Sequence, residues 1–158
     1  MKFSKKTFDI LKNYSTINSN ILVRPGNVLS TITPAKNVMA EATVHEEFPV
    51  EFGIWDLSKF LGTISLFQNP DFEFEEKYVL IRSETGSCVK YYFSEPSLLT
   101  VPTNRLKMPD TVVSFILPQS VFNEIQKAAS VLQLPDLAIR STNGVIIAAV
   151  IDKGEPTS

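Results

Sequence analysis

Residues 2–21, KFSKKTFDILKNYSTINSNI, predict the first helix of the chain. Apolar residues and threonine recur there at steps of three and four, with lysine, aspartate and asparagine between them. Residues at these steps share one helix face, so the pattern is that of an amphipathic helix with Ser4 as its N-cap. Lys5 and Lys12 are seven residues apart, and two helical turns therefore place both ammonium groups on the polar face.

Two later segments show the same helical pattern. Asp56 is the expected N-cap of a second helix, whose apolar stripe leaves Lys59 outside. Pro118 suits the first turn of a third helix, whose stripe leaves Lys127 outside. All three helices are therefore expected to pack one side on a core and to turn lysines away from it.

Short apolar or alternating runs between the helices predict strands. We expect a hairpin of residues 21–23 and 28–32 around Gly26, and a second hairpin of residues 137–141 and 145–151 around Asn143 and Gly144. The remaining strands are expected at residues 38–44, 50–54, 72–75, 78–82, 88–93 and 111–117. The order of strand, helix and hairpin repeats three times, which predicts an α+β fold with helices on one face of antiparallel sheets.

Charge is segregated along the chain. Its 15 lysines and arginines against 17 aspartates and glutamates give a net charge of −2, so bulk charge does not indicate a nucleic-acid partner. Residues 2–12 nevertheless hold four lysines and one aspartate, whereas residues 41–56 hold five acidic residues and neither lysine nor arginine. A locally positive region attracts phosphate even when the net charge is negative.

The composition offers little material for catalysis. A single cysteine, Cys88, excludes an internal disulfide, fits a reducing cytoplasm and is expected to be buried in a strand. The single histidine, His45, is expected to be a solvated surface residue. No segment approaches the run of about 20 apolar residues that spans a bilayer, so no membrane association is indicated. We expect no enzyme active site, no metal ligands and no cofactor.

Several short motifs keep the order and spacing of a known family. SKKT and LKN in the first helix are followed by TINS at residues 16–19, AEA at residues 40–42, and DL-x-x-FLG-x-x-SL at residues 56–66. In these motifs the chain resembles the sliding clamps of T-even-type bacteriophages, which are processivity factors of the phage DNA polymerase. The motif-level resemblance covers roughly the first 67 residues.

The resemblance implies a DNA-clamp fold and a replication function without enzymatic activity. Three subunits would form a homotrimeric ring around double-stranded DNA in the cytoplasm of the infected bacterial host. A clamp loader would open that ring, and the ring would tether the polymerase. Residues 1–95 would be a complete first clamp domain, 96–110 the interdomain connector, and 111–158 the first half of a second domain. The resemblance thus implies a clamp truncated at its C-terminus.

Four lysines are the candidate DNA-binding residues. Lys5, Lys12, Lys59 and Lys127 lie opposite the apolar stripes of their helices, and the resemblance implies that such helices line the hole of the ring. Lysine neutralises backbone phosphates without reading bases, as a sliding protein requires. The alternative for each residue is an ordinary lysine on a solvated helix face.

Apolar residues in the proline-rich connector are candidates for partner binding. Leu98, Leu99, Val101 and Leu106 fall in this segment. The resemblance implies that peptide tails of the polymerase and the clamp loader bind a hydrophobic pocket near the connector. The alternative is that these side chains hold the connector on its own sheet.

Two other functions remain open at this stage. One is an α+β DNA-binding or regulatory module that does not encircle DNA, with a salt-sensitive affinity equal for linear and circular DNA. The other is a small enzyme with a carboxylate site around Glu41, Glu46 and Glu51, which predicts strongly raised carboxylate pKa values.

Overall fold

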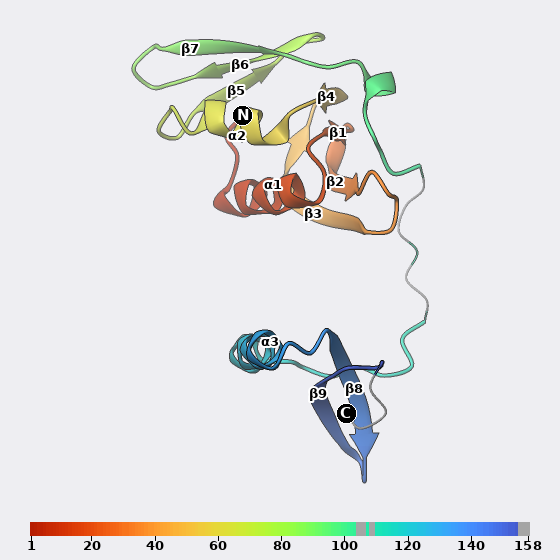
Figure 1. The fold of residues 1–158 in the computed structure, drawn as a ribbon. Helices are drawn as coiled ribbons and strands as arrows, with labels where there is room; N and C mark the ends of the chain where they lie inside the picture. The colour runs from red at the N-terminus through yellow and green to blue at the C-terminus, as the bar shows by residue number, and fades with distance from the viewer. Residues whose placement is uncertain (104–106, 108–109, 155–158) are drawn as a thin grey trace. The chain divides into compact units, whose positions relative to one another are not determined.

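A computed structural model of the chain describes residues 1–103, 107 and 110–154. The chain divides into two compact units, Met1–Met108 and Pro109–Ser158, called unit 1 and unit 2 below (Figure 1). Among the described residues, no helix combines the length and the apolar character needed to cross a membrane.

Unit 1 is an α+β fold with antiparallel sheets, as predicted. Its elements follow one another as α1 (Lys5–Ile17), β1 (Ile21–Val23), β2 (Gly26–Ile32), β3 (Met39–Phe48), β4 (Phe52–Ile54), α2 (Leu57–Ile64), β5 (Asp71–Phe74), β6 (Tyr78–Arg82), β7 (Cys88–Tyr92) and the short 3-10 helix η1 (Pro96–Leu98). Strand β1 pairs with β4, β2 pairs with β3, and β5, β6 and β7 form a three-stranded sheet in that order.

Both predicted helix caps of unit 1 are confirmed. The Ser4 hydroxyl accepts a hydrogen bond from the Thr7 amide at 3.3 Å, and the Asp56 carboxylate accepts one from the Lys59 amide at 2.8 Å. These bonds satisfy amides that the first helical turn leaves without a partner. The residues that each helix then buries are Thr7, Leu11 and Tyr14 on α1, and Leu57, Phe60 and Ile64 on α2.

The predicted hairpin of β1 with β2 is wrong. The turn itself is present, because Gly26 has a φ of +110° that favours glycine, but β1 forms its ladder with β4 and β2 forms its ladder with β3. All three residues of β1 are buried, so this strand needs neighbours that a hairpin alone does not supply. The turn reverses the direction of the chain between β1 and β2, but it does not determine which strands these two pair with.

The core of unit 1 joins its two halves, of which the first contains α1 and β1 to β3 and the second contains β4, α2 and β5 to β7. Phe3, just before α1, stacks on Phe72 of β5 with ring centroids 4.0 Å apart. Beside them the Met1 ammonium donates to the Phe72 carbonyl at 2.9 Å, and the Phe72 amide donates to the Met1 carbonyl at 2.7 Å. The buried cluster draws on both helices and on strands β1 to β6. The two halves therefore share one core, and neither half buries its apolar side alone.

The predicted burial of Cys88 is also wrong. It is exposed at the first position of β7, where exposed residues alternate with the half-buried Val89 and Tyr91. Free cysteine is usually among the most buried residue types. The two-residue period of the strand instead places Cys88 on the outer face.

Unit 2 holds α3 (Gln119–Leu132), β8 (Asp136–Thr142) and β9 (Val145–Ile151). The predicted hairpin of β8 and β9 is confirmed, and its turn residues Asn143 and Gly144 have φ of +52° and +78°. Helix α3 packs on β9. The strand predicted at residues 111–117 is not formed, since these residues belong to no ladder in the described part of the chain.

Candidate functional site

Helices α1 and α2 pack against each other in unit 1. Each turns its buried stripe toward the shared core, which leaves the opposite face to solvent. Lys5 and Lys12 on α1 and Lys59 on α2 are all exposed on this outer face. We call these three lysines, together with the groove between the helices, the two-helix surface.

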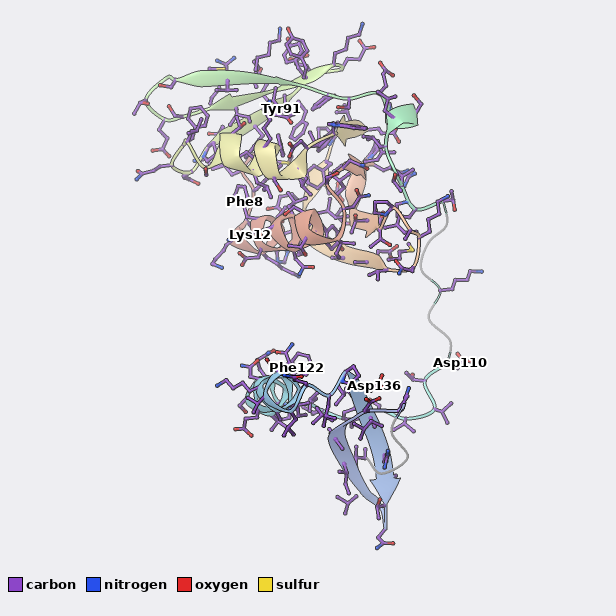
Figure 2. The ribbon with its side chains drawn as sticks, viewed as in Figure 1. Phe8, Lys12, Tyr91, Asp110, Phe122 and Asp136 are labelled. Atoms are coloured by element: carbon purple, nitrogen blue, oxygen red, sulfur yellow. The ribbon has the colours of Figure 1, made fainter. Side chains whose placement is uncertain are left out.

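The groove is a cavity of about 410 Å³ between the two helices. Phe8 and Leu61 supply its apolar lining, and Lys12 lies on its wall; Phe8 and Lys12 are labelled on α1 in Figure 2. Its other lining residues are Asp9, Ser15, Ser58, Gly62 and Ser65. The Ser15 hydroxyl donates to the Lys12 carbonyl at 2.8 Å, and the Ser65 hydroxyl donates to the Gly62 carbonyl at 2.7 Å. Lys12 and Ser58 are therefore the lining residues whose side chains can donate to a backbone phosphate.

The three lysines of the two-helix surface are not equally free to bind a phosphate. The Lys5 ammonium lies 2.6 Å from the Asp9 carboxylate, one turn along α1, and both side chains are exposed. An exposed pair of this kind contributes only a few tenths of a kcal/mol, so a phosphate can replace the carboxylate at small cost. Within the part of the chain that the structure describes, Lys12 and Lys59 form no ion pair.

Lys127 belongs to another part of the chain. It is exposed on α3 of unit 2, whereas Lys5, Lys12 and Lys59 belong to unit 1. Three of the four predicted DNA-binding lysines are thus exposed on two neighbouring helices. Their role, and the grouping with Lys127, stay predictions.

Glu46 of β3 holds the start of α1 in place. Its carboxylate accepts hydrogen bonds from the Ser4 amide and from the Thr7 hydroxyl. Burial alone would raise the pKa of Glu46, but these hydrogen bonds outweigh burial and bring its pKa below the usual value. Sequence reasoning missed this role because the partners lie 42 and 39 residues away along the chain.

The carboxylate-enzyme alternative expects the opposite electrostatics. A general acid near Glu41, Glu46 and Glu51 requires a raised pKa, whereas the pKa of Glu46 is lowered. Glu51 forms an ion pair with Arg24, the two side chains being 3.8 Å apart. Among the described residues, no group of three or more histidine, cysteine or acidic side chains is placed to hold a metal ion.

Two buried asparagines attach the segment after η1 to the end of α1. The side-chain amide of Asn18 donates to the backbone carbonyls of Ile32 at 2.8 Å and Thr100 at 3.1 Å. The Asn20 side chain accepts from the Thr100 amide at 3.0 Å. Because buried polar groups are costly without partners, these bonds fix the path of the connector residues near Thr100.

Leu99 is packed against β4 of unit 1. A Cβ on Gly53 of β4 would lie 2.6 Å from Leu99 Cδ1 and 2.5 Å from the Ser94 carbonyl oxygen, so only glycine fits this close approach. Leu99 is buried, whereas Leu98 is 63% exposed and Val101 is half-buried. Leu106, the fourth predicted partner-binding residue, lies outside the described residues.

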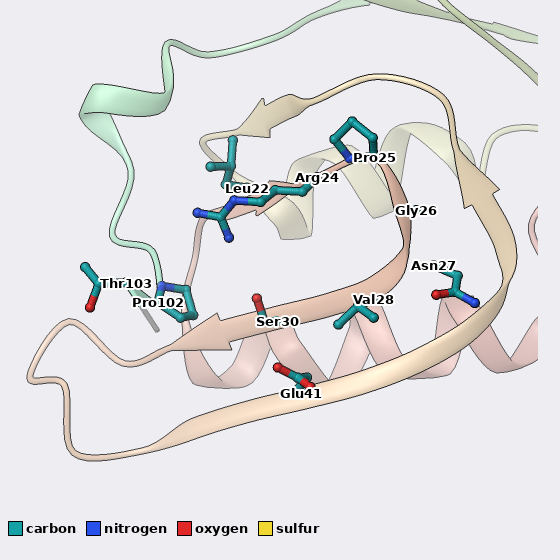
Figure 3. A pocket seen from close by; sticks show the side chains of 10 residues that line it. All are labelled: Leu22, Arg24, Pro25, Gly26, Asn27, Val28, Ser30, Glu41, Pro102 and Thr103. Carbon is teal, nitrogen blue, oxygen red and sulfur yellow. The ribbon is translucent and has the colours of Figure 1, made fainter. Parts of the chain in front are cut away.

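A pocket of about 400 Å³ lies where the connector meets the β1–β2 turn (Figure 3). Pro102 and Thr103 face it from the connector, Arg24 from the turn and Glu41 from β3. The rest of its lining is Leu22, Pro25, Gly26, Asn27, Val28 and Ser30. The pocket thus offers an apolar wall and one charge of each sign, built from three separate segments that sequence reasoning did not connect.

Comparison with known proteins gives one consistent match. A protein-family model described as DNA polymerase processivity factor matches residues 2–86. The sliding clamp of Vibrio phage KVP40 is 28% identical over 147 residues, which cover 91% of this chain and 66% of that protein. The sliding clamps of Escherichia phage RB69 and Enterobacteria phage T4 are 26% and 27% identical, over 65% and 70% of their lengths. The chain thus spans about two thirds of the length of these relatives.

Proposed function

We propose that this chain, which belongs to the DNA polymerase processivity factor family, is a subunit of a sliding clamp that encircles duplex DNA and tethers a phage DNA polymerase. The observation that carries the proposal beyond family membership is the two-helix surface. It presents Lys12, which lines the groove, and Lys59, which is exposed on α2, and neither forms an ion pair within the described residues.

The chemistry of this surface fits contact with the DNA backbone. Lysine and serine bind phosphate oxygens, and flexible lysine side chains do not fix the register of the protein on the duplex. Apart from Phe8, which is half-buried in the groove, the described residues of α1 and α2 present no aromatic side chain on this surface for stacking on bases, which favours duplex over single-stranded DNA. Each contact is weak, so we assign long residence on DNA to encirclement.

The test measures retention of the chain on circular and linear duplex DNA, after loading by the clamp loader of the same phage and ATP. We expect retention on circular DNA and rapid loss from linear DNA, because a ring slides off a free end. A triple variant with Lys5→Glu, Lys12→Glu and Lys59→Glu should lose about tenfold in salt-dependent loading onto the DNA, since each phosphate contact contributes to the affinity of the chain for the duplex. Lys77→Glu, outside the two helices, is the matched control.

Two results would contradict this function. Equal retention on linear and circular DNA would point to a module that binds without encircling. Equal behaviour of the triple variant and the Lys77→Glu control would remove the two-helix surface from the mechanism.

We further propose that polymerase and clamp-loader peptides bind at the connector. Leu98 is exposed there, Val101 is half-buried, and the pocket lined by Pro102, Arg24 and Glu41 adjoins the same segment. Leu98→Asp with Val101→Asp should weaken binding of the polymerase tail without unfolding unit 1. Retention of DNA by this variant would separate partner binding from DNA binding.

The finer features of the family assignment are also proposals. We infer a homotrimeric ring that a clamp loader opens, and action in the cytoplasm of the infected bacterial host. Mass measurement of the DNA-loaded complex tests the first of these inferences. A complex that contains a number of copies other than three would overturn it.

A further inference from the structure

The TINS motif at residues 16–19 holds a buried asparagine that neither function proposed above uses. Asn18 is 3% exposed and is the C-cap of α1, where its backbone amide donates to the Tyr14 carbonyl at 2.9 Å. Asparagine is favoured at helix ends that turn into the left-handed conformation, but Asn18 has an extended backbone with φ of −146°. The end of the helix therefore does not require this side chain, which leaves another role for it.

The side chain of Asn18 joins two walls of the pocket beside the connector, called the connector pocket below. Its Nδ2 donates to the carbonyl of Ile32, at the end of β2, at 2.8 Å and to the carbonyl of Thr100, on the connector, at 3.1 Å. Strand β2 and the connector both contribute lining residues to the connector pocket, whose volume is about 400 Å³ (Figure 3). A side-chain amide nitrogen carries two hydrogens, so one group of Asn18 supplies a bond to each wall.

Asn20 completes the hold on Thr100. Its Oδ1 accepts from the Thr100 amide at 3.0 Å, and its backbone amide donates to Asn18 Oδ1 at 3.1 Å. Both backbone groups of Thr100 are therefore bonded to side chains, as they would be to the backbone of a neighbouring strand. Asn18 and Asn20 are both buried, and a buried hydrogen bond is costly to break because its donor and acceptor lose their partners away from water.

The chain after Thr100 transmits this anchor to the connector pocket. Pro102, two residues on, is buried and lines the pocket. Its ring fixes its own φ, and the residue before a proline is restricted to extended conformations. On the other side of Thr100, Leu99 is buried beside Gly53. Little freedom therefore remains between Thr100 and Pro102, and the wall that Pro102 forms follows the position of Thr100.

We propose that Asn18 and Asn20 are positioning residues that preform the connector pocket for a partner peptide. This inference rests on the peptide binding proposed at the connector and names the side chains that order that site before the peptide arrives. Neither asparagine lines the pocket, so both act through the connector. A site that is already ordered binds more tightly, because the apparent affinity is reduced by the fraction of chains whose site is not formed.

Two nearly isosteric variants separate this role from a general effect of charge. Asn18→Asp replaces the donor that faces two carbonyls by a carboxylate oxygen, which accepts but does not donate and is repelled by both carbonyls. Asn20→Asp keeps an oxygen that accepts from the Thr100 amide and adds the same charge two residues away. Asn20→Asp is therefore the matched control for Asn18→Asp.

Fluorescence anisotropy measures binding of a labelled peptide from the tail of the polymerase of the same phage to the full chain. Asn18→Asp should raise the dissociation constant about tenfold, mainly through slower association, because fewer chains hold a formed pocket. Asn20→Asp should stay within about twofold of wild type, because it retains the acceptor for Thr100. Val79→Ala, at a fully buried position of β6, should lower the urea midpoint and leave the dissociation constant unchanged.

Hydrogen exchange without peptide measures the order of the connector itself. The amides of Leu99, Thr100 and Val101 should exchange faster in Asn18→Asp than in wild type, and at the wild-type rate in Asn20→Asp. If Asn18→Asp does not fold, Asn18→Ser takes its place, because it removes the amide without adding a charge. The same faster exchange and weaker peptide binding are expected of that variant.

Three results would overturn the inference, and they differ in what else they remove. A wild-type chain that does not bind the peptide would remove the proposed peptide site together with its positioning residues. Equal binding by wild type and Asn18→Asp would leave the peptide site in place and remove the role of the asparagines. Equal weakening by Asn18→Asp and Val79→Ala would show that Asn18 acts only on the stability of unit 1.

Discussion

Units 1 and 2 share the pattern of a capped or proline-led helix followed by strands, yet only unit 1 builds a core. In unit 1 the two helices and the strands β1 to β6 bury a continuous cluster that includes Phe3, Leu29 and Phe60. In unit 2 no residue in the described range 110–154 is buried, and apolar side chains of β8 and β9 such as Ile139 and Ile147 remain exposed. One helix and one hairpin therefore have an apolar side but lack the second layer that would cover it.

The largest expected effect on stability comes from removing a side chain of the core that joins the halves of unit 1. Phe3→Ala should destabilise unit 1 by about 3–5 kcal/mol, because it removes a buried ring stacked on Phe72. Phe122→Ala, at a half-buried position of α3, should lower the free energy of unfolding much less. Urea unfolding followed by fluorescence of Trp55, the single tryptophan, reports on unit 1, and circular dichroism of the helices reports on both units. Equal loss in the two variants would remove the contrast between the units.

A smaller effect is expected where the connector approaches β4. Gly53→Ala should cost about 1–3 kcal/mol, because the added methyl would overlap the Ser94 carbonyl and Leu99. Gly62→Ala on the exposed face of α2 meets open space and should stabilise unit 1 by up to about 1 kcal/mol. Opposite signs in thermal unfolding would support the close packing of Leu99. A neutral Gly53→Ala would show that Leu99 is free to leave.

Glu46→Gln should have the smallest effect of the three and depend on pH. Because the folded-state pKa of Glu46 is lowered, its carboxylate stabilises unit 1 above the unfolded pKa near 4.5, and this contribution disappears as pH falls through the folded pKa. The variant should therefore lose about 1 kcal/mol at neutral pH and approach wild type in acid. Glu47→Gln, an exposed neighbour, is the control. A loss of stability independent of pH would contradict the view that the ionised Glu46 carboxylate holds the start of α1 through its bonds to Ser4 and Thr7.

Local features were predictable from the sequence, and features that depend on distant partners were not. The caps Ser4 and Asp56 and the Asn143–Gly144 turn act within a few residues, so their residue types identify them. Two other features join residues far apart in the sequence, which a local pattern does not encode. They are the pairing of β1 with β4 and the hydrogen bond from the Ser4 amide to the Glu46 carboxylate.

The candidate site divides in the same way. Helical periodicity predicted the exposure of Lys5, Lys12 and Lys59, whereas the groove between α1 and α2 and the pocket beside the connector required the packing of separate segments. Residues 111–117 have the composition of a strand, but a strand also requires a hydrogen-bonded neighbour, and the composition of a segment does not identify that neighbour.

Hydrogen exchange of the full chain tests the contrast between the units most directly. We predict that amides of β1, β4 and β5, which contribute to the buried core of unit 1, exchange slowly. Amides of β8 and of residues 111–117 in unit 2 should exchange faster, because no described residue of unit 2 is buried. Protection of β8 equal to that of β1 and β4 would contradict the account.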